Sequence, residues 1–186
     1  DEDAGAHATR DFTWSGGDRL RVEVPADIVY TQGPQAKVTI AGPAEAVNRV
    51  HVASGRIDYG EEGAPGYDGA RLKIIMTAPD VRRFDLTGSQ NLVIEGFKQD
   101  RLELDVSGAA QVSAKGEARE AALDIAGSGD ADLHELVVQD ARIDISGSGH
   151  TKIGPKGTAR VDVSGDGEVE LTAKPKKLVT DISGSG

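Results

Sequence analysis

The sequence has no cysteine among its 186 residues, so disulfide bonds, thiolate metal sites and cysteine nucleophiles are all excluded. Aromatic residues are scarce too, with one Trp, three Tyr and three Phe, and none follows Phe97. The second half of the chain must therefore fill its interior with Val, Ile, Leu and Ala. No apolar run is long enough to cross a bilayer, so no membrane insertion of this segment is expected.

Positive charge is also in short supply, because 21 Lys and Arg stand against 31 Asp and Glu, which gives a net charge of −10. An acidic chain repels nucleic-acid phosphates and anionic membrane surfaces, so neither is an expected partner. No nucleophile–base pattern or phosphate-binding loop occurs. The sequence therefore predicts no catalytic residue, no metal site and no cofactor.

What the sequence does contain is one short motif, present six times. Each copy has an Asp between two residues that are apolar except at Thr180, followed by a small residue and a Gly. The glycines follow one another at intervals of 20, 19, 20, 18 and 19 residues. A period this short indicates stacked coils rather than a globular core. The Asp residues of the motif are Asp85, Asp105, Asp124, Asp144, Asp162 and Asp181.

The motif also predicts the path of one coil. Side chains alternate between the two faces of a strand, so the residues beside each Asp face inward and the Asp faces outward. The Gly marks a corner, because Gly adopts positive φ without steric cost. A second apolar strand follows each corner and ends at a further bend. The sequence thus predicts an all-β fold, a single-stranded parallel β-helix with coils of about 19 residues, and the crossover preference favours the right-handed form.

The regularity of the repeat suggests how the chain is divided. Residues 1–10 are predicted to be a flexible N-terminal segment, and residues 11–186 a single β-helix domain. Within that domain, residues 11–80 form irregular N-terminal coils and a cap, and residues 81–186 form the regular repeats.

Three further features modify this division. Residues 44–49 and 118–122 have a weak helical pattern, and both stretches are short. The printed chain stops directly after the sixth corner, in mid-repeat. We expect that the repeat region of a longer protein continues there, or that a partner covers this end. An open coil exposes unpaired backbone, so a homo-oligomer formed through it is also an expectation.

The segments Val22–Ile28 and Tyr30–Gly33, together with the recurring Ser-Gly-Ser-Gly corners, resemble a bacterial family, putative auto-transporter adhesin, head GIN domain. The resemblance runs from about Asp11 to the end of the chain. The motif that names the family has its nearest match in Gly88–Asn91, which reads GSQN and departs from it. The resemblance implies a single-stranded right-handed β-helix and export to the periplasm, the cell surface or the extracellular space. It brings no catalytic residue with it.

The outward Asp column is the first candidate site. Like charges one strand spacing apart destabilise a sheet, and calcium favours carboxylate oxygens. The calcium-binding nonapeptide repeat, however, is half as long and richer in Gly. We expect instead that each Asp binds backbone N–H groups of its own corner.

The strand after the corner carries a second candidate. If the repeats are in register, Asp130, His150 and Glu168 share one outward column, and Lys152 lies between two carboxylates in the next column. The alternating signs predict cross-strand ion pairs. The alternative is a site in which His150 and its carboxylate neighbours bind a metal or a sugar.

Aromatic rings are the third candidate, because Trp14, Tyr30, Tyr59 and Tyr67 offer flat faces for stacking on a sugar. The commoner role of such residues is to fill a cap or a local core. Tyr67 lies in a Gly-rich loop over residues 60–69, so it is expected to be the most exposed of the four.

These features predict a non-catalytic, exported β-helix module for adhesion or interaction at the bacterial envelope, with polysaccharide or another envelope protein as its partner. The main alternative is a polysaccharide lyase or hydrolase on the same scaffold, because a fold alone does not decide function. Hydrolysis commonly needs paired carboxylates, and a lyase needs a base and cations along a groove. A third alternative is a structural module that assembles with itself.

Overall fold

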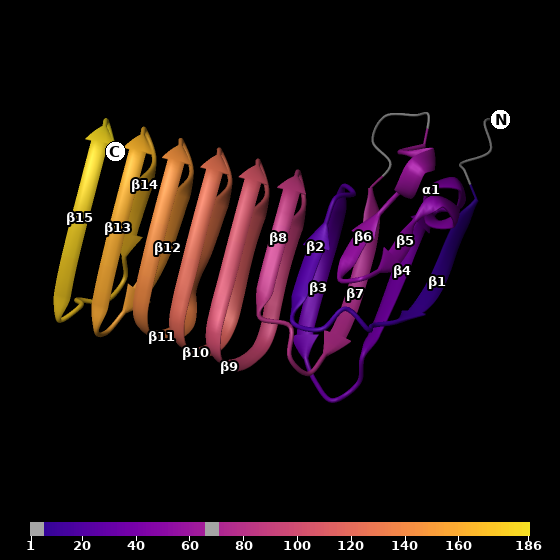
Figure 1. Cartoon of the computed structure of the whole chain (residues 1–186), viewed down its shortest axis with the longest axis horizontal. Helices are drawn as coiled ribbons and strands as arrows, with labels where there is room; N and C mark the ends of the chain where they lie inside the picture. Colours follow the sequence, from indigo (N-terminus) through magenta and orange to yellow (C-terminus); the bar gives the residue numbers. More distant parts are fainter. Residues whose placement is uncertain (1–5, 66–70) are drawn as a thin grey trace.

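The computed structural model describes residues 6–65 and 71–186. The strands stack side by side along one long axis, with the N-terminal elements at one end and β15 at the other (Figure 1). The described elements are β1 (His7–Thr13), β2 (Arg19–Val22), β3 (Ala26–Gln32), β4 (Lys37–Pro43), α1 (Ala44–Arg49), β5 (His51–Ala53), β6 (Arg56–Asp58), η1 (Gly60–Glu62), β7 (Leu72–Ala78), β8 (Arg83–Gly88), β9 (Asn91–Gly108), β10 (Gln111–Gly127), β11 (Asp130–Gly147), β12 (His150–Pro155), β13 (Thr158–Gly165), β14 (Glu168–Leu171) and β15 (Lys177–Gly184).

The regular part of the stack begins at β8, and its strands pair in parallel from coil to coil. The six Asp residues of the motif are directly opposite one another in register, and so are the six glycines that follow them. The residues on either side of each Asp are buried from Phe84 to Val163. The prediction of an all-β solenoid built from stacked parallel coils is therefore confirmed.

The Gly corners hold successive coils together through their backbones. Ala109 donates its N–H to the carbonyl oxygen of Gly88, and Ser148 donates to that of Gly127, at N···O distances of 3.0 and 2.9 Å. At Gly147, φ is +116°, and a Cβ atom would lie 2.4 Å from the carbonyl oxygen of Gly127. Glycine is needed there both for its conformation and because the neighbouring coil approaches so closely.

The N-terminal coils do not stack in the order of the sequence. β2 lies between β6 and β8, and β3 lies between β7 and β9. β4 runs antiparallel between β1 and β7. The chain thus begins at the end of the stack with β1, passes inward to the coil of β2 and β3, and goes back towards the end with β4. It then returns through β6 and β7 before the regular repeats begin.

The structure corrects the prediction for residues 118–122, which belong to strand β10. This segment pairs with both neighbouring strands, β9 and β11, and the hydrogen bonds between the strands outweigh the helix propensity of its alanines. Residues 44–49 do form helix α1. Strand β1 begins at His7, so residues 7–10, which the sequence places in a flexible segment, pair with β4. No helix within the described ranges is long and apolar enough to cross a membrane.

The corner geometry predicts which glycines tolerate a side chain. Gly147→Ala should lower the midpoint of denaturant unfolding, because alanine at positive φ costs about 1–3 kcal/mol and its Cβ would clash with the preceding coil. Gly33→Ala is the control, because a Cβ there has no atom within 4 Å and its φ is not in the left-handed region. Equal unfolding midpoints for the two variants would contradict this account of the corner.

Candidate functional site

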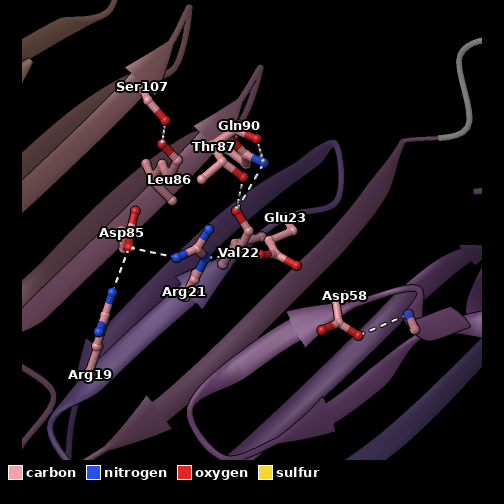
Figure 2. Close-up of polar contacts among 11 residues, drawn as sticks. Arg19, Arg21, Val22, Glu23, Asp58, Asp85, Leu86, Thr87, Gln90 and Ser107 are labelled. Carbon is pink, nitrogen blue, oxygen red and sulfur yellow. Dashed lines mark hydrogen bonds and ion pairs between the residues drawn. The ribbon is translucent and has the colours of Figure 1, made fainter. Parts of the chain in front are cut away.

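The six outward Asp side chains form a row along one side of the stack, here called the Asp ladder. Its first member, Asp85, accepts a hydrogen bond from Arg19 at 2.8 Å and lies 3.6 Å from Arg21 (Figure 2). Arg21 lies directly opposite Asp85 in the register of β2 and β8. The N-terminal neighbour of the row of carboxylates is therefore a positively charged guanidinium group. The remaining five Asp residues form no hydrogen bond or ion pair with any part of the chain that the structure describes.

The expectation that each Asp binds its own corner is therefore wrong. From Gly108 onward, the N–H group of the residue after each Gly is already donated to the Gly carbonyl oxygen of the preceding coil. The Asp lies three residues before the Gly, and its side chain points away from the sheet. Its carboxylate therefore accepts no hydrogen bond from the corner. The ladder is thus a row of free acceptors rather than a structural cap.

The second Asp of the row, Asp105, shows the electrostatic consequence of the unpaired carboxylates. Partial burial and the charges of Asp85 and Asp124 raise the pKa of Asp105 above its ordinary value, although Arg19 and Arg21 reduce the effect. The ladder therefore carries like-charge repulsion that its neighbours only partly offset.

A second outward row runs beside the ladder, two residues earlier on each strand. Three of its members form ion pairs: Arg19 binds Asp85, and Arg83 lies 2.9 Å from Glu103, which also binds Arg101 at 2.6 Å. Arg142 and Arg160 have no hydrogen bond or ion pair within the described parts of the chain. In register, this row consists of Arg19, Arg83, Glu103, Ala122, Arg142, Arg160 and Val179.

Ala122 leaves a hollow in this row, because its side chain is a single methyl group between Glu103 and Arg142. The hollow, here called the Ala122 hollow, has a volume of about 250 Å³. A second depression of about 360 Å³ shares Arg101, Ala122 and Arg142 with it. The sequence analysis missed this site. Comparing the residues two positions before each Asp would have revealed the small side chain among Arg and Glu.

The structure does bring Asp130, His150 and Glu168 together in one column, as the register predicts. Nδ1 of His150 lies 3.3 Å from Oε2 of Glu168, and the His150 backbone N–H donates to Asp130 at 3.2 Å. No group of three or more His, Cys, Asp or Glu suited to a metal ion occurs in residues 6–65 and 71–186. The geometry is that of cross-strand pairing, and a sugar-binding role for these residues stays a prediction.

One neighbouring contact on this face has no counterpart in the sequence analysis. Nδ1 of His134 and its backbone N–H both contact Oδ1 of Asp132, and these hydrogen bonds lower the pKa of Asp132. The two residues are two apart on β11 and therefore share its outer face.

Three of the four aromatic candidates lie in the core of the N-terminal coils. Trp14, Tyr30 and Tyr59 are 5%, 0% and 7% exposed, so their faces are not free for a sugar. The hydroxyl of Tyr30 donates to the carbonyl oxygen of Ala78 at 2.8 Å, and burial raises the pKa of Tyr30 to about 12. These rings fill the cap, which is the commoner of the two roles considered. Tyr67 lies outside the described residues.

The GSQN segment at residues 88–91 has a structural role. Gln90 is 1% exposed, and its Nε2 donates to the carbonyl oxygens of Val22 and Thr87 (Figure 2). The same Nε2 also donates to the carbonyl oxygen of Val24. Later corners carry Ala or Gly where Gln90 stands. The amide thus fastens the first regular coil to the coil of β2 and β3.

Strand β15 exposes three apolar side chains: Leu178, Val179 and Ile182. Leu178 and Ile182 line a hollow of about 480 Å³ together with residues of β13 and β14. Self-association through this last coil stays a prediction.

The charge repulsion in the Asp ladder predicts that removing the charge of Asp105 changes the stability of the protein. Asp105→Asn should raise the free energy of unfolding at pH 7 by at most about 1 kcal/mol, since the side chain is exposed and water screens its repulsion. A raised pKa means that folding favours the protonated acid, so the wild type loses stability as the pH rises through that pKa. The gain from Asn should therefore vanish below the ordinary Asp value of 3.8.

The control for this measurement is Asp166→Asn, at an exposed corner outside the ladder. Urea unfolding of both variants at neutral and acidic pH provides the comparison. A destabilised Asp105→Asn variant at pH 7 would show that the ladder is not under repulsion.

Several solved structures have the same fold. A putative adhesin from Bacteroides fragilis NCTC 9343 is 18% identical, with a TM-score of 0.68 over 97% of this chain and 95% of that one. A putative adhesin from Parabacteroides distasonis ATCC 8503 is 16% identical, with a TM-score of 0.61 over 98% and 96%. A putative lipid binding protein from the same organism is 17% identical, with a TM-score of 0.54 over 98% and 96%. At these identities, the likeness shows the fold alone.

Among curated proteins, none matches this sequence. The family comparison is more informative, because residues 18–175 match the family described as "Putative auto-transporter adhesin, head GIN domain". The match covers the N-terminal coils as well as the regular repeats, and it agrees with the resemblance found in residues 22–33 and in the corners. The chain therefore belongs to the head GIN domain family of putative auto-transporter adhesins.

Proposed function

We propose that this chain is an exported, non-catalytic adhesion module of the bacterial envelope, and that it binds polysaccharide along the face that carries the Asp ladder. The observation that carries the proposal is the in-register row of free carboxylates, repeated once per coil over β9, β10, β11, β13 and β15. The family supports the adhesive part, because its description names an auto-transporter adhesin.

The ladder suits a polymer better than a small molecule. Successive coils are about 4.8 Å apart, so an extended chain of sugars lying along the stack meets an equivalent Asp at each step. Each contact is weak and exposed, but linked contacts raise the overall affinity through effective concentration. The hollows beside the ladder are open depressions on a sheet, which suit one side of a chain rather than an enclosed ligand.

One observation favours a glycoside hydrolase as the second candidate. Asp105 has a raised pKa and lies one coil from Asp85 and Asp124, and a retaining glycosidase also places two carboxyl groups about 5 Å apart. Such a pair must flank the scissile bond from opposite sides. The ladder side chains all leave the same side of one sheet, so they can approach only one side of a sugar.

Binding to immobilised polysaccharides tests the proposal. The wild-type chain should bind at least one polysaccharide in a panel of neutral, acidic and aminated polymers and release no reducing ends or unsaturated products. Replacing Asp124, Asp144 and Asp162 by Ala should abolish binding, because alanine has no acceptor at the positions that supply the free carboxylates.

The matched control changes the other charged face, with His150→Gln and Glu168→Gln in one variant, and it should bind as the wild type does. Loss of binding in this control with retention in the ladder variant would move the site to the Asp130, His150 and Glu168 column. Turnover that disappears in Asp105→Asn would establish the hydrolase instead. Absence of binding to every polymer would refute the polysaccharide proposal.

A further inference from the structure

We infer that the Ala122 hollow is the principal ligand subsite and that its ligand is a neutral, hydroxyl-rich glycan rather than an acidic or aminated one. This inference rests on the proposed function and specifies where the polysaccharide binds and to which chemical class it belongs.

The shape of the surface singles out this position. Ala122 stands directly opposite Glu103 on one side and Arg142 on the other, so a methyl group interrupts a row of long side chains. The two depressions that share Ala122 together extend from Arg19 to Arg160. An extended ligand lying along the stack can therefore approach the backbone at β10 while the flanking side chains contact its edges.

The Ala122 hollow has both hydrogen-bond acceptors and a hydrogen-bond donor that lack a partner within the described residues. Asp105 and Asp124 line it as acceptors, and neither has a hydrogen-bond partner among the described residues. Arg142 lines both depressions as a donor and is equally free. A sugar hydroxyl donates one hydrogen bond and accepts others, so neighbouring hydroxyls can satisfy a carboxylate and a guanidinium at once.

The charge balance selects against charged polymers. The Ala122 hollow is lined by five carboxylates and four guanidinium groups, so its local charges nearly cancel. An acidic polymer would meet the unpaired ladder on a chain whose net charge is −10. An aminated polymer would be attracted by the ladder carboxylates, but beside the hollow it would also meet the free guanidinium groups of Arg142 and Arg160. A neutral glycan uses the donors and acceptors without either repulsion.

Filling the hollow tests the location. Ala122→Gln adds a side chain without charge at an outward strand position, and it should weaken binding to the immobilised neutral polysaccharide by about tenfold or more. The control is Ala126→Gln, which adds the same side chain four residues further along β10, beyond Asp124, and should leave binding unchanged. Arg142→Gln is the second variant, because it removes the free donor without filling space, and it should weaken binding in the same direction. Circular dichroism and thermal unfolding should show that all three variants fold.

The ligand class is tested with a neutral β-glucan, mannan and galactan, acidic polygalacturonate and alginate, and aminated chitosan. We expect a neutral polymer to bind, with little change between low and high salt, because no net charge is neutralised. Preference for polygalacturonate, alginate or chitosan would overturn the neutral class while leaving polysaccharide binding intact. Wild-type binding by Ala122→Gln and Arg142→Gln would overturn the subsite and leave the ladder proposal standing. Failure to bind any polymer would refute the proposed function itself.

Discussion

The hydrogen bond from the residue after each corner glycine to the glycine carbonyl of the preceding coil is the constraint on which the rest of this structure depends. At Gly147 a Cβ atom would lie 2.4 Å from the backbone carbonyl oxygen of Gly127, so the two coils can approach this closely only because residue 147 is glycine. A slip of one residue would place a side chain in that contact and would also turn the apolar residues outward. The corners therefore fix the register of every strand in the regular stack.

A fixed register determines the chemistry of the outer faces. It places the six Asp residues in one row, although like charges in adjacent strands oppose stacking. Burial of the inward residues outweighs this repulsion, since each buried Leu, Ile or Val side chain contributes about 1.5–3 kcal/mol and an exposed pair costs at most about 1 kcal/mol. Arg19 and Arg21 form ion pairs with Asp85 and only reduce the repulsion at Asp105, so the free carboxylates begin at Asp105.

The regular coils could be predicted from the sequence because their signals are local. The alternation around each Asp and the spacing of the glycines give both the faces and the register, and they also placed His150 between Asp130 and Glu168. The position of β2 between β6 and β8 depends on pairing between distant segments, and no local pattern encodes which of them meet. Free side chains are equally hard to predict. An Asp before a Gly corner suggests a cap, and only the backbone hydrogen bonds show that the corner is already satisfied.

The contrast between repeated and irregular positions explains why function is expected at the irregular outward positions. Inward residues and corner glycines are required by every coil, so their repetition reports the fold and says little about a ligand. Outward positions beside the ladder are free to vary, and there Arg, Glu and Ala alternate along an otherwise uniform stack. Ala122 is informative because the fold does not need a small residue there, since Glu103 and Arg142 occupy equivalent places in the adjacent coils. A side chain that is shorter than the scaffold requires leaves space, and on this face that space lies beside free donors and acceptors.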